Sequence, residues 1–285
     1  MPSWRTPWLA SWLTPWSGQA LRLGIAPDGL ALVRTSRWQH ERALLLGDLR
    51  LATNGQYQGL EAVAEALPLL LDQHRLAGMP LTVVLSDELV RLWQVAPPPG
   101  ASRMADLEAA AALRYQSLFG AAPAGWTVRA DWSAARPFLA AAVPDALLAQ
   151  LTAAAAAHRF HLVEVAPQFV AALNQFRKQL RPGAWFGLVH GGVLSVAAFD
   201  GALLAAVRTA PIPEDADRDW LEGHVAREAL RVGLGRPERL QVCGPAPNGW
   251  ASSAGRLKFA CTLFEDETDR LWPDSARLAV TGRGP

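Results

Sequence analysis

Side chains able to perform catalysis are present in this chain, but few stand at a spacing that a known reaction requires. His158 and His161 are three residues apart, a spacing that can bind a metal on one helix face. A helix is expected to end between them and no third ligand follows, so we interpret them as polar helix-end residues. Asp87 and Glu88 are paired carboxylates between two expected strands, which indicates a solvated turn. His190 is interpreted as a hydrogen-bonded turn histidine rather than a general base.

The sequence also lacks the motifs of common catalytic sites. It contains no G-x-S-x-G, Walker loop or H-E-x-x-H. Gly233–Leu234–Gly235 follows an expected helix and is interpreted as a helix stop, because a dinucleotide fingerprint must follow a strand. The 2 cysteines, Cys243 and Cys261, exclude a disulfide scaffold and a cysteine-rich zinc module. We therefore expect no catalytic residue and no metal.

Composition limits the class of partner. The chain has 285 residues, and 27 Lys+Arg nearly cancel 26 Asp+Glu, giving a net charge of +1. This balance argues against nucleic acid as a partner, and the length suits one large or two small domains. No stretch has the length and apolarity of a membrane span, and the N-terminus does not resemble a signal peptide. The expected location is the cytoplasm, with contact at a membrane face left open.

The elements that must position the polar residues occur twice in the same order. Short apolar runs at 20–26, 30–35 and 43–52 predict three antiparallel strands. Asp28–Gly29 is expected to form the first turn, because glycine accepts a positive φ. A helix over 57–77 and a strand at 81–85 complete a β-β-β-α-β order. The order recurs in strands at 185–189, 194–199 and 203–208, a helix at 214–234 and a strand at 239–243.

Between the two repeats the sequence predicts an insertion rich in alanine. It follows a strand at 89–95 and begins with a helix over 102–119, with Ser102 as its N-cap and Gly120 as its stop. Strands at 126–132 and 137–143 follow. A helix at 144–158, a strand at 161–165 and a helix at 167–180 then lead to the second repeat. An internal repeat of this length suggests duplication of one α/β unit.

A duplicated β-β-β-α-β unit resembles the actin-like (ribonuclease H-like) superfamily, an α/β fold of two βββαβαβ lobes. The segments LRLGIAPDGLALVRT and LTVVLSDELVRLWQVAPPPGASRMADLEAAAALRYQSLFG resemble one branch, PilM of type IV pilus assembly and the GspL cytoplasmic part of type II secretion. FHLVEVAPQFVAALNQF is similar to the stretch before that branch's second half. The resemblance includes an Arg-Tyr pair, here Arg114–Tyr115. The implied units are 1–18, 19–182 with a subdomain at about 100–160, and 183–285 with a reduced subdomain.

The chemistry that this resemblance implies needs residues that the chain replaces. The superfamily places an Asp at the end of the first strand to organise a magnesium ion, where this chain has Ala26, followed by Pro27, Asp28 and Gly29. Proline also removes an N–H donor. The second phosphate hairpin reads His190, Gly191 and Gly192, with a histidine in place of the carboxylate. Near the adenosine position only Gly244 remains. We therefore expect no ATP hydrolysis and no bound cofactor.

The resemblance further implies a non-catalytic scaffold at the inner-membrane face of a bacterium. Its implied partner is the cytoplasmic N-terminal tail of a bitopic membrane protein, PilN in pilus systems, received by the first half. A motor ATPase is a second implied partner. The alternative is an actin-fold small-molecule kinase or ATPase with a degenerate nucleotide site. An adaptor that serves outside secretion also remains open.

The N-terminus carries a separate signal. Trp4, Trp8, Trp12 and Trp16 recur every four residues, with Leu9 and Leu13 between them. A four-residue step drifts by about 40° per repeat on an α-helix, so the four indoles share one broad face of a short helix at about 7–14. Such a stripe suits a partner's groove, a membrane interface or the chain's own domain. All three destinations remain open.

Overall fold

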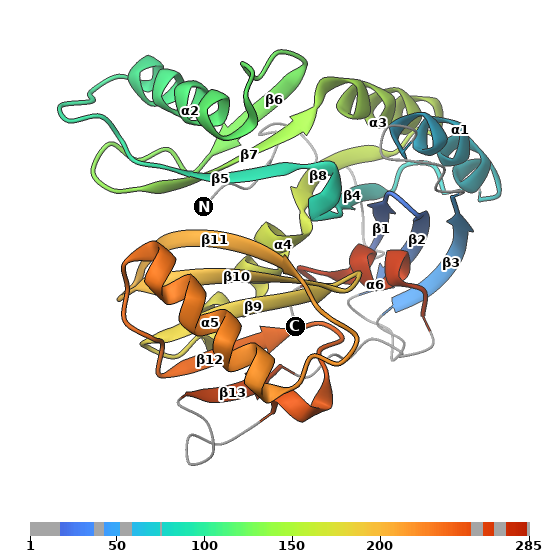
Figure 1. Ribbon diagram of the computed structural model, residues 1–285. Coiled ribbons are helices and arrows are strands. Elements are labelled where there is room, and N and C mark those ends of the chain that lie inside the picture. The colour runs from blue at the N-terminus through green and yellow to red at the C-terminus, as the bar shows by residue number, and fades with distance from the viewer. Residues whose placement is uncertain are drawn as a thin grey trace.

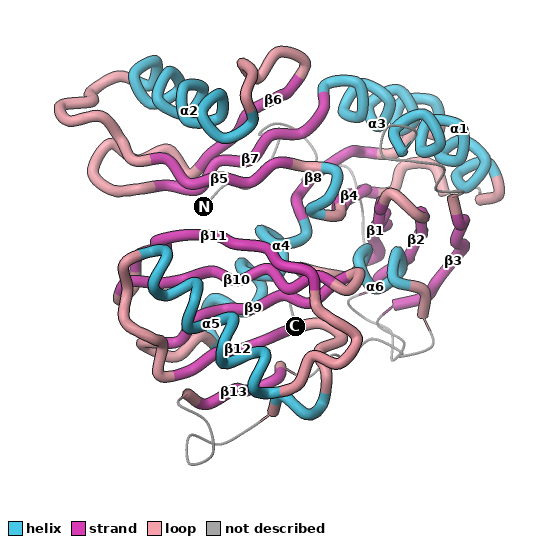
Figure 2. Tube along the Cα trace, viewed as in Figure 1, coloured by secondary structure: helices cyan, strands magenta, loops and turns pink. Residues whose placement is uncertain are grey.

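The computed structural model describes residues 18–36, 43–51, 59–74, 76–251, 259–264 and 272–283. Figure 1 shows two sheets, each with helices packed on it, and a smaller lobe that lies beside strand β11 (Leu203–Pro211) of the second sheet. Figure 2 shows the same arrangement with helices and strands in separate colours. The predicted helix at about 7–14, with Trp4, Trp8, Leu9, Trp12, Leu13 and Trp16, lies outside the described residues.

The first sheet has the strand order β3-β2-β1-β4-β8. β1 pairs antiparallel with β2 and parallel with β4, and two helices, α1 and α3, cover one of its faces with an apolar core. The central strands are buried on both faces, which explains their nearly continuous apolar sequence. The elements of this half are β1 (Gln19–Ala26), β2 (Gly29–Ser36), β3 (Ala43–Arg50), α1 (Gly59–Asp72), β4 (Pro80–Leu85), α3 (Asp145–Ala157) and β8 (His161–Pro167).

The second sheet repeats the first. Its order is β11-β10-β9-β12-β13, so in both sheets the first three strands form an antiparallel meander and the next two add in parallel beside the first strand. The predicted duplication of one unit in two separate sheets is therefore confirmed. Its elements are β9 (Ala184–His190), β10 (Val193–Asp200), β11, α5 (Arg218–Val232), β12 (Arg239–Cys243), the 3-10 turn η3 (Asn248–Trp250) and β13 (Ala260–Leu263).

Two helices lie between the sheets. α4 (Gln168–Phe176), which continues into the 3-10 turn η2 (Arg177–Gln179), packs on the second sheet opposite α5. α6 (Asp274–Val280) packs on β1, β2 and β4 of the first sheet, opposite α1 and α3. The sequence assigned residues 183–285 to the second half, yet this closing helix returns to the first. The chain therefore crosses between its halves again near its end.

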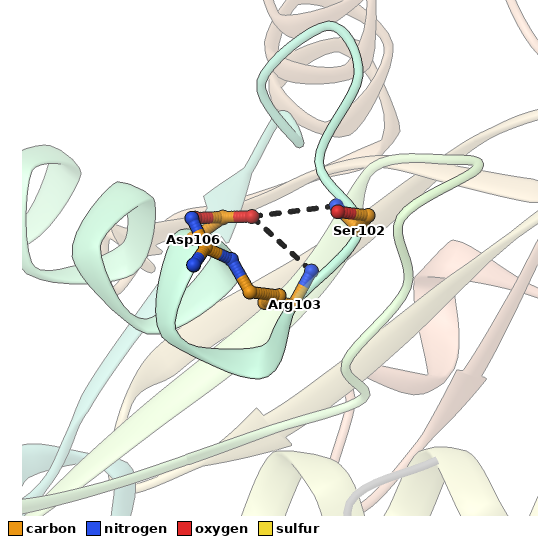
Figure 3. Close-up of polar contacts among 3 residues, drawn as sticks. All are labelled: Ser102, Arg103 and Asp106. Atoms are coloured by element: carbon orange, nitrogen blue, oxygen red, sulfur yellow. Dashed lines mark hydrogen bonds and ion pairs between the residues drawn. The ribbon is translucent and has the colours of Figure 1, made fainter.

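The smaller lobe is a sheet of order β5-β7-β6 with one helix on it. It consists of β5 (Arg91–Val95), α2 (Met104–Phe119), β6 (Trp126–Ala130) and β7 (Phe138–Pro144), so it begins earlier and ends earlier than the expected 100–160. The N-cap of α2 is Arg103 rather than the predicted Ser102. Figure 3 shows the contacts at this helix start: one oxygen of Asp106 accepts from the backbone N–H groups of both Ser102 and Arg103, at 3.3 and 3.1 Å. Gly120 ends the helix in the left-handed conformation, as expected.

Aromatic residues fill the core of the smaller lobe. Tyr115 is buried and packs edge-on to Trp93, with ring centroids 5.2 Å apart. The arginine that pairs with it is Arg91 of β5, whose Nη1 donates to the Tyr115 hydroxyl at 2.5 Å. Arg114, which precedes Tyr115 in the Arg-Tyr sequence pair, is exposed. Gln94 donates from its side chain to the Leu204 carbonyl of β11, which joins the lobe to the second half.

Candidate functional site

Two tight hairpins occupy the positions at which the sequence predicted a degenerate nucleotide site. Ala26 pairs with Gly29 across the first turn, so Pro27 and Asp28 are its central residues. His190 pairs with Val193 across the second turn. There Gly191 and Gly192 have φ of +56° and +73°, which glycine adopts without the cost a side chain would add. The second predicted turn is thus confirmed, and the first hairpin is confirmed in position but turns at Pro27 and Asp28 rather than at Asp28 and Gly29.

Gly29 serves a different purpose from the one its sequence suggested. Its φ is not positive, because the chain turns at Pro27 and Asp28 and Gly29 already begins β2. A Cβ on Gly29 would lie 3.0 Å from the Leu49 carbonyl oxygen and 3.6 Å from the Ser275 Oγ. Glycine is therefore needed for close packing. The first turn of α6, to which Ser275 belongs, lies directly over the first hairpin.

Ala26 stands at the end of β1 but is not open to a ligand. It is 3% exposed and packs with Val84 of β4 and Leu278 of α6. A methyl group enclosed by two aliphatic side chains offers neither an oxygen ligand nor space for a hydrated cation. The structure thus adds a steric obstacle to the chemical one that the sequence indicated.

Asp87 is not a solvated turn residue, which corrects the interpretation from sequence for this carboxylate, whereas Glu88 is exposed as expected. They begin the 3-10 turn η1 (Asp87–Leu89) between β4 and β5. Both carboxylate oxygens of Asp87 lie 3.1 Å from the backbone nitrogen of Phe169, near the start of α4, so this partly buried side chain caps a helix distant in sequence. Glu88 extends toward the second hairpin, where its Oε1 lies 3.7 Å from the position a Cβ would take on Gly191.

Carboxylates gather where the hairpins meet. Burial raises the pKa of Asp87 to about 7, with a smaller rise from Glu88 and a lowering from the Phe169 hydrogen bond. Burial and the nearby Asp28 raise the pKa of Glu88. Asp274, at the start of α6, is a further acidic neighbour of His190. This junction therefore places negative groups beside the hairpin backbones, where a phosphate would need donors and cations.

His190 does not supply the missing positive charge. Burial lowers its pKa below the ordinary value, although Asp274 and Asp28 act in the opposite direction and Arg277 adds to the lowering. The imidazole is accordingly neutral at pH 7 and above. A neutral histidine at a turn matches the modest role that the sequence suggested better than that of a phosphate-binding cation.

Gly244 is held against a neighbouring strand. Its φ is +89°, and a Cβ there would lie 2.1 Å from the Val189 carbonyl oxygen, next to His190. The positive φ and the close approach to β9 directly after β12 are enough to require glycine here. Its presence therefore does not indicate a base-binding surface.

Some interpretations from sequence concern residues away from this junction. His158 is the C-cap of α3 and lies 3.7 Å from the Asp72 carboxylate, while His161 begins β8 on an exposed position. Within the described ranges, no three His, Cys, Asp or Glu side chains are arranged to hold a metal ion. In the same part of the chain, no helix has both the length and the apolarity to cross a membrane.

The sequence reasoning missed two contributors to this junction. α6 was not predicted, although Pro273–Asp274 followed by apolar residues is a helix-start signal. Arg22 of β1 was not singled out because a lone arginine in a strand has no distinguishing pattern. Its guanidinium donates to the carbonyl oxygens of Ala279 and Thr281, both at 2.6 Å, and so fixes the C-terminal end of α6.

The raised pKa of Asp87 predicts a pH dependence of stability. A carboxyl group whose pKa rises from 3.8 to about 7 on folding contributes stability that is complete below pH 3.8 and is lost as the pH rises through 7. We expect Asp87→Asn to remove this loss, because the amide is uncharged and its oxygen can still accept from Phe169. Between pH 5 and 8, the free energy of unfolding of the variant should rise relative to that of the parent by up to about 3 kcal/mol.

Urea unfolding of both proteins across this pH range measures the effect. Taking the difference between them cancels the titration of His190 and His224, whose lowered pKa values act in the opposite direction. Asp87→Ala is the matched control, because it removes the charge together with the helix cap. If the free energy of unfolding of the parent and of Asp87→Asn varied with pH in the same way, Asp87 would be ionised in the folded protein without destabilising it.

Comparisons with known proteins find similarity in structure rather than in sequence. No protein-family model and no curated protein matches the chain. A solved protein of Bacteroides thetaiotaomicron with an actin-like ATPase fold and unknown function superposes with a TM-score of 0.59 at 7% identity, covering 87% of this chain and 91% of the other. Two solved structures from secretion and pilus systems also match over nearly their whole length.

The first of the two is the PilM–PilN type IV pilus biogenesis complex. It matches with a TM-score of 0.58 at 18% identity, over 93% of this chain and 99% of the other. The second is the cytoplasmic domain of EpsL, an inner-membrane component of the type II secretion system of Vibrio cholerae, with a TM-score of 0.50, 17% identity and 93% coverage of both chains. At these identities the matches establish the fold, so the chain has the two-lobed actin-like α/β fold that its sequence predicted.

Proposed function

We propose that this chain is a non-catalytic cytoplasmic scaffold of an inner-membrane assembly platform of the type IV pilus or type II secretion kind. Its partner would be the N-terminal cytoplasmic tail of a bitopic membrane protein similar to PilN, with a motor ATPase as a second partner. The observation that carries the proposal is the likeness to PilM–PilN over 93% of this chain and 99% of the other. The EpsL match supports the same class of machine.

The junction of the two halves supports a role without catalysis. The position of the superfamily's metal-organising aspartate is Ala26, enclosed by Val84 and Leu278. Proline at the first turn offers no N–H to a phosphate. The neighbouring charged groups include the carboxylates of Asp28, Glu88 and Asp274. Within the described residues these carboxylates form no group of three that could hold a metal ion, and no feature of those residues favours a small-molecule kinase.

Co-purification tests the proposed partner. The tagged full chain, expressed with the membrane proteins of a pilus or secretion platform from the same bacterium, should retain a single-span protein with a short cytoplasmic N-terminus. A synthetic peptide of that tail should then bind the purified chain in a one-to-one ratio, and a peptide of the same composition in scrambled order should not. If the tail peptide does not bind, the chain lacks the proposed partner even if other platform proteins are retained.

A second prediction concerns ATP. The purified chain with magnesium and ATP should release phosphate at the background rate, because no described group replaces the carboxylate that organises the metal. Asp28→Ala should leave that background unchanged, and a phosphate-release assay measures both. A reproducible rate that Asp28→Ala abolishes would contradict the non-catalytic role and would favour the kinase or ATPase alternative.

A further inference from the structure

A buried carboxylate on α5, away from the junction of the halves, holds two exposed arginines. The Glu228 side chain is 4% exposed, and its Oε1 accepts from Nη1 of Arg231 at 2.6 Å. Its Oε2 lies 3.9 Å from Nε of Arg208 on β11, too far for a hydrogen bond. The two arginine side chains are 66% and 51% exposed. One buried carboxylate thus orients Arg231 and lies close to Arg208, while both arginines remain largely open to solvent.

The flank of α5 beside these arginines carries another cation and an exposed apolar residue. At about 100° per residue, Arg227, Leu230 and Arg231 fall on the outward side of the helix, opposite the buried Leu221, Val225 and Ala229. Leu230 is 82% exposed. We call Arg208, Arg227, Leu230 and Arg231 the α5 surface. It joins three guanidinium groups to one apolar side chain on a helix and an edge strand.

The interior beneath the α5 surface contains stacked aromatic rings and two buried polar atoms that lack a hydrogen-bond partner. His224, one turn before Glu228, stacks on Trp220 with ring centroids 5.2 Å apart, and Trp220 stacks on Trp250 at 5.7 Å. The Nε2 of His224 and the Oε2 of Glu228 are buried and have no hydrogen-bond partner. A buried carboxylate without a full set of partners is costly. Folding stability alone therefore does not explain why an ionisable group stands here.

We propose that the α5 surface binds an acidic segment of a protein partner, whose carboxylates pair with Arg208, Arg227 and Arg231 and whose apolar side chain packs on Leu230. The charge of the surface is complementary to such a segment, and guanidinium groups pair with carboxylates in a fixed, forked geometry. Glu228 lowers the entropy cost of binding by holding Arg231 through a hydrogen bond and by attracting Arg208 at 3.9 Å beforehand. The inference does not depend on the proposed scaffold function.

An anionic membrane surface is the competing occupant. Attraction to anionic lipids sums over basic residues near the surface and does not require them to be fixed. A buried glutamate that reduces the local positive charge would weaken such attraction. The presence of Glu228 therefore favours a protein segment, whose binding depends on the positions of the arginines, over a membrane, whose binding depends on net charge.

Substitution of Glu228 distinguishes binding that needs positioned arginines from binding that needs only net charge, because the first should weaken and the second should strengthen. The probe is a fluorescein-labelled peptide of alternating glutamate and leucine, titrated into the full chain and followed by anisotropy. Glu228→Gln raises the positive charge of the α5 surface but releases Arg208 and Arg231. We expect the variant to bind the peptide several-fold more weakly. Tighter binding by Glu228→Gln would overturn the proposal, because it would show that only net charge matters.

Further variants keep the test independent of folding. Arg231→Gln and Arg208→Gln should each weaken binding about tenfold, as for the loss of one charge-assisted contact, while exposed Arg136 of the smaller lobe, changed to Gln, should leave it unchanged. Leu230→Gln, at an exposed position that cannot disturb the core, should also weaken binding. A peptide with glutamine in place of glutamate should not bind.

Two results would contradict the proposal directly. One is equal binding of the glutamate and glutamine peptides. The other is failure of the glutamate peptide to bind while vesicles of phosphatidylglycerol and phosphatidylcholine bind and lose affinity in Arg231→Gln. The second result would assign the α5 surface to a membrane.

Discussion

Gly24→Ala should lower the free energy of unfolding of this protein by on the order of 3 kcal/mol or more. Gly24 lies in β1, and a Cβ there would stand 2.1 Å from the Ser275 carbonyl oxygen and 2.7 Å from the Ala279 nitrogen. Both are backbone atoms of α6, so no side-chain rotation can relieve the overlap. The helix must move off the sheet, which exposes the apolar contacts of Ala276 and Leu278 with β2 and β4.

Chemical denaturation followed by circular dichroism measures this loss, and limited proteolysis near residue 272 locates it. Gly235→Ala is the matched control, because Gly235 has no atom within 4 Å of an added Cβ and no positive φ. It should change stability by a few tenths of a kcal/mol, in the favourable direction. Equal stability of the two variants would mean that α6 does not rest on β1.

Arg22→Met should destabilise the protein by about 2–4 kcal/mol. The guanidinium donates to the Ala279 and Thr281 carbonyl oxygens at the end of α6, and hydrogen bonds to a charged group are worth about 1.5–3 kcal/mol each. Burial lowers the pKa of Arg22 to about 10, against the opposing effect of Glu164, so the group remains charged at neutral pH. Methionine preserves the apolar stem but leaves both carbonyls and the Glu164 charge without this partner.

Arg22→Lys distinguishes loss of charge from loss of geometry. Lysine retains the positive charge but lacks the planar fork that reaches two carbonyls at once, so we expect about half of the destabilisation. Arg50→Met, on the exposed end of edge strand β3, is the control for removing an arginine from this sheet and should have little effect. If Arg22→Met unfolds at the same denaturant concentration as Arg50→Met, the arginine does not hold α6.

Local sequence signals determined most of the secondary structure and the duplication. The turn at Gly191–Gly192 needs two positive φ angles, and the glycines that permit them are visible in the sequence. The first hairpin was located correctly, although its turn lies at Pro27–Asp28. Apolar runs between such turns are strands in either half, so the repeated order was predictable and the two sheets confirm it. Helix ends were less certain, as at Arg103, because several neighbouring residues can cap a helix.

Contacts between distant segments decided the character of the junction. Asp87 reads as a turn residue until α4 places the Phe169 N–H beside it, about eighty residues later. From the sequence, Ala26 is simply a missing ligand, and only the structure shows that Leu278 encloses it. Composition and periodicity predict contacts only between residues that are a few positions apart in the sequence. Burial and electrostatic environment depend on which segments meet, and for these residues only the tertiary structure decides that.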